Sequence, residues 1–167
     1  MKNDQFEQLY EDHAEGLLGF LVYRTGDRGL AEEILADTFE RVLRSRSRFN
    51  PKRGSAKTWI YSIALNRLRD LGRRREAEGR ALDRSGAGEP GVAGDEVERI
   101  EQRSTVAAAL AELGEEEREA VSLRYGADLS VAEVAAALGV KVSTAEGRIY
   151  RGLRNLRDLL EPVRDQP

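Results

Sequence analysis

Apolar residues recur at intervals of three and four along nearly the whole chain, and no convincing run alternates apolar and polar residues one by one. This spacing is typical of amphipathic α-helices rather than of β-strands. In the first half it predicts helices over about 4–24, 30–44 and 56–75. Pro and Gly bracket the segment 49–55, which we expect to be a loop. The chain is therefore predicted to be all-helical.

The second half predicts helices over 105–113 and 115–124, followed by a helix-turn-helix. Two serines with a glutamate three residues later, Ser130 with Glu133 and Ser143 with Glu146, fit the capping-box pattern that starts a helix. Gly139 lies between them, where the chain must leave one helix and turn toward the next. This pairing predicts a DNA-binding motif with two capped helices.

Residues 76–103 are rich in Gly, Ala, Glu and Asp and contain a Pro, which is typical of a flexible linker. We therefore expect two small, separate helical domains, over 1–75 and 104–167. The predicted fold class is all-α, with the flexible linker between the two domains and the helix-turn-helix in the C-terminal one.

Composition excludes several function classes. The chain has no cysteine, which removes disulfides and thiolate chemistry and fits a cytoplasmic location. Its longest apolar stretch is far too short to span a bilayer, and the acidic N-terminus lacks a basic leader, so we expect no membrane insertion. No nucleophile, acid–base pair or metal-ligand set has supporting spacing. We therefore expect no enzyme activity, no cofactor and no metal.

The net charge of −3 conceals a strong segregation of charge along the chain. Residues 1–40 carry a net charge of −7 and residues 41–80 carry +10. Residues 81–139 carry −8, and residues 140–167 carry +2. Two basic segments, each preceded by an acidic one, indicate two DNA-facing surfaces and two surfaces for another partner.

Three segments resemble bacterial RNA polymerase sigma factors of the extracytoplasmic-function (ECF) group. The segment 26–42 is similar to the helix that binds core polymerase in that family. The segment 58–75, from Thr58-Trp-Ile-Tyr to Arg73-Arg-Arg, is similar to the helix that opens the minus-ten promoter element. The segment 113–140 is similar to the region that reads the minus-thirty-five element. The resemblance implies a protein that binds core RNA polymerase and promoter DNA, with an anti-sigma protein as a further partner.

Opening a duplex without ATP requires a basic groove and side chains that hold extruded bases. The third predicted helix and the loop before it supply both kinds of residue, with cations for the phosphates and other side chains for base contact. Of the latter, Trp59 is favoured as a core residue, whereas Asn66 is the better candidate for DNA. The full downstream set is Arg46, Arg48, Phe49, Lys52, Arg53, Lys57, Trp59, Tyr61, Asn66, Arg67, Arg73, Arg74 and Arg75, and Arg69 is a further candidate for phosphate contact.

The second helix of the helix-turn-helix is expected to enter the major groove with its N-terminal turns. The upstream set is Lys141, Ser143, Thr144, Glu146, Gly147, Arg148 and Arg151. Glu146 and Gly147 depart from the family pattern, which has a cation and a helix former at these positions. Glu146 is interpreted as a helix cap in preference to a base contact, and Gly147 either weakens the helix or allows closer approach to DNA.

The expected polymerase-binding residues lie on the second helix and just before it: Asp27, Glu32, Glu33, Asp37, Glu40 and Arg41. Ala36 departs from the family, which commonly has Gln there. The main alternative function is a stand-alone helix-turn-helix regulator with an N-terminal sensor or dimerisation domain. The basic segment 41–80, which contains Arg73-Arg74-Arg75, argues against it, because a sensor domain has no need of such a segment.

Overall fold

The computed structural model describes residues 1–85 and 105–161, and every regular element in these two ranges is helical. The expected linker therefore lies mostly outside the described residues. The helices of the N-terminal half are α1 (Asn3–Thr25), α2 (Arg28–Ser45), the 3-10 turn η1 (Arg46–Arg48) and α3 (Ala56–Ser85). Those of the C-terminal half are α5 (Thr105–Glu112), α6 (Glu115–Val121), the π-helical turn η2 (Ser122–Gly126), α7 (Val131–Leu138) and α8 (Val142–Leu160). The all-helical prediction is confirmed.

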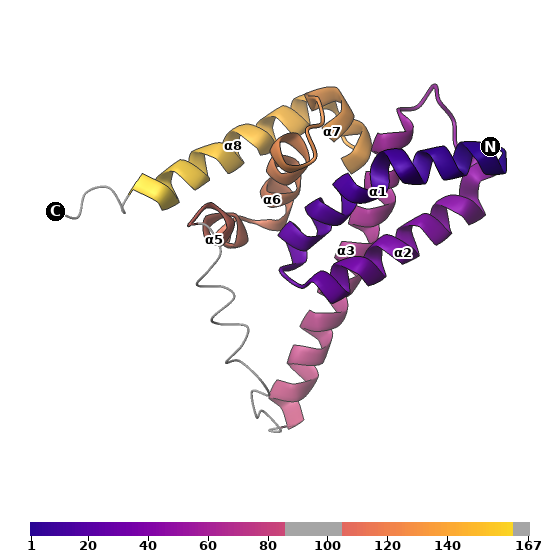
Figure 1. Cartoon of the computed structure of the whole chain (residues 1–167). Helices are drawn as coiled ribbons and strands as arrows, with labels where there is room; N and C mark the ends of the chain where they lie inside the picture. The colour runs from indigo at the N-terminus through magenta and orange to yellow at the C-terminus, as the bar shows by residue number, and fades with distance from the viewer. Residues whose placement is uncertain (86–104, 162–167) are drawn as a thin grey trace.

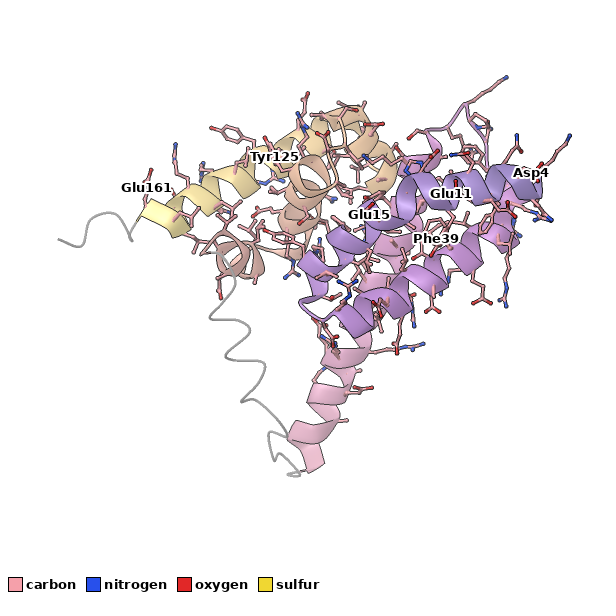
Figure 2. All side chains as sticks on the ribbon, viewed as in Figure 1. Asp4, Glu11, Glu15, Phe39, Tyr125 and Glu161 are labelled. Carbon is pink, nitrogen blue, oxygen red and sulfur yellow. The ribbon has the colours of Figure 1, made fainter. Side chains whose placement is uncertain are left out.

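A tight turn joins α1 to α2, and both residues of that turn are suited to it. Gly26 has a φ of 67°, the left-handed conformation that a glycine adopts without a Cβ penalty. Asp27 follows as the N-cap of α2, and its carboxylate accepts a hydrogen bond from the amide of Leu30 at 3.2 Å. The two helices then pack along their apolar faces, where the rings of Phe6 and Tyr10 meet Phe39 edge-on. Phe39 of α2 is labelled in Figure 2.

Helix α3 ends at Ser85, ten residues beyond the predicted end at Arg75. The prediction was wrong because residues 76–85 were assigned to the linker from the composition of the whole segment 76–103. Glu, Ala, Arg and Leu dominate this stretch, and these residues have high helix propensity even where nothing packs against them. This last part of α3 extends away from the other helices (Figure 1), and residues 73–81 are all exposed.

The helix-turn-helix is confirmed, but only one of its two predicted capping boxes exists. Ser130 Oγ accepts from the Glu133 amide at 3.2 Å, and the Glu133 carboxylate accepts from the Ser130 amide at 2.8 Å. Gly139 ends α7 with a φ of 68°, as the turn requires. Helix α8, however, begins two residues before the predicted start.

The N-cap of α8 is Lys141, whose backbone is extended and whose carbonyl accepts from the Ala145 amide at 3.0 Å. The turn after Gly139 is completed by the Val140 amide, which donates back to Ala135 at 3.0 Å. Because this turn is so short, Ser143 already lies within the first helical turn and cannot cap it. The interpretation of Glu146 as the partner of Ser143 in a capping box is therefore wrong.

The two halves, which we expected to be separate, pack against each other and share one apolar core. Buried Phe20, Ile60 and Tyr61 of the N-terminal half belong to the same cluster as Leu123 and Leu129 of the C-terminal half. The Phe20 and Tyr61 rings meet edge-on at 5.3 Å. Helix α3 contacts α7, and Lys57 Nζ donates to the Ala127 carbonyl at 2.7 Å. The described chain is therefore in a closed arrangement.

Candidate nucleic-acid interface

The loop before α3 and one side of α3 form a basic surface. Arg48, Lys52 and Arg53 are exposed on the loop, where the Asn50 side chain accepts from the Lys52 amide at 3.0 Å and holds the turn. Further along α3, the exposed members of the predicted downstream set are Asn66, Arg73, Arg74 and Arg75. Among the described residues, Arg73 forms an ion pair with Asp70, which lies one turn earlier in α3, so part of the charge of Arg73 is neutralised locally.

Two aromatic rings lie together beside the loop. Phe49 and Trp59 are half-buried, and their rings are 5.1 Å apart with 32° between their planes. They line a cavity of about 200 Å³ with Arg48 and Arg53 at its edge. Trp59 also packs against the apolar core, as the sequence indicated, so one ring serves both the core and the cavity. Ala136 of α7 contributes to the wall, which makes the cavity partly dependent on the closed arrangement.

Several residues of the downstream set are not on this surface. Tyr61 is 3% exposed and faces Phe20, and burial raises the pKa of its hydroxyl. The structure therefore does not present Tyr61 to a base, because its ring packs in the apolar core against Phe20. Lys57 is committed to the Ala127 carbonyl.

Two predicted cations of this half pair with neighbouring polar side chains. Arg67 Nε donates to Asp37 Oδ2 at 2.8 Å, which joins a predicted DNA contact to a predicted polymerase contact. Arg46 Nη1 donates to the Asn3 side chain at 3.2 Å. Both residues are only half-exposed. They are therefore weaker candidates for phosphate contact than the loop cations.

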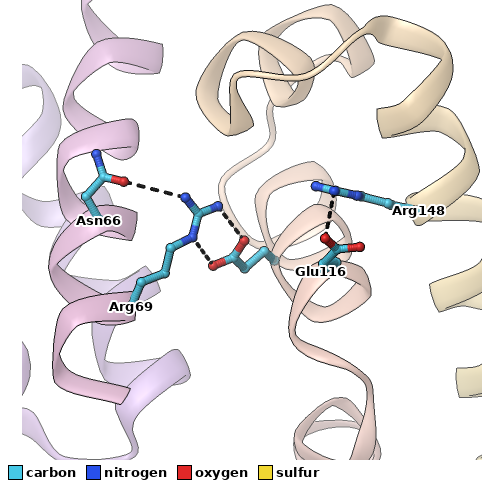
Figure 3. A network of polar contacts seen from close by, with 5 residues as sticks. Asn66, Arg69, Glu116 and Arg148 are labelled. Atoms are coloured by element: carbon cyan, nitrogen blue, oxygen red, sulfur yellow. Dashed lines mark hydrogen bonds and ion pairs between the residues drawn. The ribbon is translucent and has the colours of Figure 1, made fainter. Parts of the chain in front are cut away.

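The charged contact that sequence reasoning missed joins the two halves. Arg69 donates through Nε and Nη2 to the two carboxylate oxygens of Glu119, at 2.8 and 2.7 Å (Figure 3). Glu119 is 3% exposed, and the Arg69 side chain is 32% exposed. Such bidentate, charge-assisted pairs are strong and geometrically specific. Nothing in the local sequence marks Glu119, which is one of four glutamates in α6.

The N-terminal end of α8 presents part of the predicted upstream set. Lys141, Ser143, Thr144 and Glu146 are exposed there, and Gly147 is half-buried. Arg148 is turned away from this end, because its Nη2 donates to Glu116 of α6 at 2.9 Å and only 15% of its side chain is exposed. Arg151 also faces α6, with 3.8 Å between its Nε and Glu117 Oε1. Arg148 and Arg151 of the upstream set are therefore paired with α6 in this structure.

The predicted polymerase-binding residues lie along one exposed region of α2 and its N-cap. Asp27, Glu32, Glu33, Glu40 and Arg41 are exposed, and Asp37 is half-buried. Among the described residues, Glu32 forms an ion pair with Arg28 at 3.1 Å, and Glu40 forms one with Arg44 at 2.5 Å. Exposed pairs of this kind contribute only about 0.3–0.5 kcal/mol, so a partner can replace them at low cost.

Neither a metal centre nor a membrane span is found in the described chain. Over residues 1–85 and 105–161, no three His, Asp or Glu side chains are grouped so that they could hold a metal ion. Nor is any helix in these ranges sufficiently long and apolar to cross a bilayer. The site is therefore a set of charged and aromatic surfaces on helices.

Comparison with known proteins identifies the family of this chain. The family described as Sigma-70 region 2 matches residues 9–78, and Sigma-70, region 4 matches residues 103–156. RNA polymerase sigma factor CarQ of Myxococcus xanthus is 33% identical over 94% of this chain and 90% of its own length. ECF RNA polymerase sigma factor SigK of Mycobacterium sp. (strain KMS) is 30% identical over 94% of this chain and 83% of its own length.

The fold is also that of a solved relative. The structure of CnrH in complex with the cytosolic domain of CnrY is similar with a TM-score of 0.73 and 25% identity, covering 99% of this chain and 92% of that one. Both sequence regions and the whole helical arrangement thus agree. The chain belongs to the ECF sigma factors of RNA polymerase.

Proposed function

We propose that the two halves of this sigma factor divide the work of promoter recognition. Helices α1–α3 bind core RNA polymerase in the cytoplasm and open the minus-ten element, and helices α5–α8 read the minus-thirty-five element as duplex. The expected boundaries at 75 and 104 are kept as a proposal with one change, since α3 continues to Ser85. An anti-sigma partner, which family membership favours, would act by blocking one of these surfaces.

The observation that carries the proposal is the Phe49–Trp59 pair beside exposed cations. A cavity of about 200 Å³ with an aromatic wall can accept one unstacked base, and Arg48 and Arg53 lie where its phosphates would follow. Stacking of a base on an aromatic ring is worth about 1–3 kcal/mol, which offsets the cost of unstacking it from the duplex. Exposed Asn66 and the arginines at 73–75 continue the surface along α3.

The polymerase surface is proposed on α2, with Asp27, Glu32, Glu33, Glu40 and Arg41 exposed toward a partner. Asp37 is a weaker candidate because Arg67 already binds it. The end of α8 formed by Lys141, Ser143, Thr144 and Glu146 is proposed to meet the upstream element. Arg148 would join this contact only after releasing Glu116, whose side chain is 70% exposed and weakly held.

Run-off transcription with purified core polymerase tests the proposed melting surface. The triple change Arg73→Ala, Arg74→Ala and Arg75→Ala should reduce open-complex formation at a cognate promoter while leaving co-migration with core polymerase intact. Arg80→Ala, further along the same helix, is the control and should transcribe as the parent does. If the triple variant transcribes at the parental level, these arginines have no role in melting.

A further inference from the structure

A polar cavity of about 210 Å³ lies between the two halves, beside the Arg69–Glu119 pair. Its charged lining consists of Arg24 from α1, Arg69 and Arg75 from α3, and Arg118, Glu115 and Glu119 from α6, and leucines of α2 and α3 form an apolar wall. Four cations therefore face two carboxylates. Because Glu119 is committed to Arg69, the remaining cations are poorly compensated.

Two guanidinium nitrogens at this cavity have unused hydrogen-bonding capacity. Arg24 Nη1 and Arg118 Nε are buried from solvent and have no acceptor among the described residues. Within residues 1–85 and 105–161, the hydrogen bond given for Arg118 is a long one through Nη1, 3.5 Å from the Ala111 carbonyl. A buried charged donor without a partner is costly, so such groups are normally found with an anion or a hydrogen-bonding ligand.

The direction of the pKa shift of Arg24 is consistent with a buried cation that lacks a counter-ion. Burial and, after it, repulsion from Arg118 lower its pKa to about 10, because Glu119 and Glu115 oppose the shift only in part. Arginine almost always keeps its proton, so a shift of this size indicates a cation in an unfavourable environment. An anion placed between Arg24 and Arg118 would compensate the charge of both guanidinium groups.

We propose that the cavity between α1, α3 and α6 is a binding site for a phosphate group, held by Arg24 and Arg118 with Arg75 at its entrance. A phosphate dianion matches the excess of two cations over two carboxylates, and its oxygens accept several guanidinium hydrogen bonds at once. The volume fits a free phosphate ion or the phosphate group of a small ester. Because Arg24 and Arg118 belong to different halves, the bound anion favours the closed arrangement.

Isothermal titration calorimetry on the full chain tests this site, with inorganic phosphate as the probe and ionic strength held constant with sodium chloride. One phosphate should bind per chain. Arg24→Met and Arg118→Met each keep an apolar stem but remove the guanidinium, and each should weaken binding about ten- to a hundredfold. Arg80→Met, on α3 but outside the cavity, is the control and should bind as the parent does.

Thermal unfolding provides a second measurement, in which the shift in Tm on adding phosphate is determined within each variant. At about ten times Kd, phosphate should raise the parent Tm by about 3–6 °C, and equal ionic strength of chloride should not. Arg24→Met should raise the Tm without phosphate, because it removes an unfavourable buried charge, and should lose the phosphate increment.

Tighter binding of glycerol 3-phosphate than of phosphate assigns the site to a phosphate ester, and the reverse assigns it to the free ion. The proposal is overturned by equal affinities in parent and Arg24→Met, or by a response to a DNA oligonucleotide but not to phosphate.

Discussion

Arg69 of α3 and Glu119 of α6 form a bidentate ion pair that connects the two halves of the chain (Figure 3). Arg69 lies one turn from Asn66, so the pair occupies the helix proposed to open DNA. Its carboxylate partner is buried at 3% exposure. A contact that fastens a basic helix to the opposite half has consequences for both stability and DNA binding.

Glu119→Gln should reduce the free energy of unfolding by about 1–3 kcal/mol, because it removes the charge of a buried carboxylate and leaves Arg69 without its counter-ion. The loss is kept below that of a fully buried pair because the Arg69 side chain is 32% exposed. Urea unfolding followed by circular dichroism measures it. Glu116→Gln, on the same helix but 70% exposed, is the matched control and should change stability by less than about 1 kcal/mol.

Ser130→Ala and Ser143→Ala should differ, although the two serines have the same local sequence signal. Ser130 caps α7 and exchanges hydrogen bonds with Glu133, so its loss should cost about 0.5–2 kcal/mol. Ser143 lies inside the first turn of α8, where alanine has the higher helix propensity. Its substitution should be neutral or slightly stabilising in the same urea measurement. Equal losses at both sites would mean that α8 begins later than the structure shows.

Gly147→Ala and Gly152→Ala should have opposite effects on stability, although both glycines are in α8. A Cβ on Gly152 would lie 2.5 Å from Val121 Cγ2 and 3.3 Å from the Glu117 carbonyl, so α6 and α8 would have to separate. Overpacking of this kind costs about 1–3 kcal/mol. A Cβ on Gly147 would meet only the movable end of Arg151, at 3.2 Å from its Nη1, and the helix should gain about 0.5–1 kcal/mol. Thermal unfolding of the two variants measures both changes, with a lower Tm expected for Gly152→Ala and a higher Tm for Gly147→Ala.

Local patterns predicted the helices well, because each helix in the described chain has its own apolar spacing and several have their own caps. The Ser130 box, the Gly139 turn and the loop before α3 all depend on residues a few positions apart. The end of α3 could not be predicted in the same way. Residues 76–85 are good helix formers with no apolar face, and this composition is shared by exposed helices and by linkers.

The candidate site was predictable only where it depends on one half of the chain. Exposed Arg48, Lys52 and Arg53 could be predicted from the basic segment alone. Tyr61 is buried against Phe20 and Arg69 pairs with Glu119, and both contacts join residues far apart in the sequence. The spacing of residues along the sequence does not predict such contacts. The same apolar or charged residue is equally compatible with an exposed position. The closed arrangement is thus a property of the two halves together.

The pKa of His13 gives the stability of the protein a small pH dependence near neutrality. Partial burial lowers that pKa below 6.5, and Lys57 adds to the effect, while Asp12 opposes it. The unfolded chain therefore takes up a proton before the folded chain does, so folding stability should rise with pH between the lowered pKa and 6.5. His13→Gln should remove this part of the slope. Urea unfolding of parent and variant from pH 5 to 7.5 isolates the effect as a difference, and parallel curves would exclude it.

Release of Arg69 should also change how the protein binds single-stranded DNA. In the closed arrangement the guanidinium is occupied by Glu119, and Glu119→Gln frees it for a phosphate. One added phosphate contact should steepen the slope of log K against log salt by about 0.7 for a single strand. Glu116→Gln removes the same charge from the same helix but frees Arg148 instead, which lies on α8 and away from α3. Fluorescence anisotropy with a labelled oligonucleotide of minus-ten sequence, titrated at several salt concentrations, measures both slopes. If the two variants steepen the slope equally, release of Arg69 adds nothing beyond release of Arg148, and the Arg69 pair has no specific role in restraining binding to the minus-ten strand.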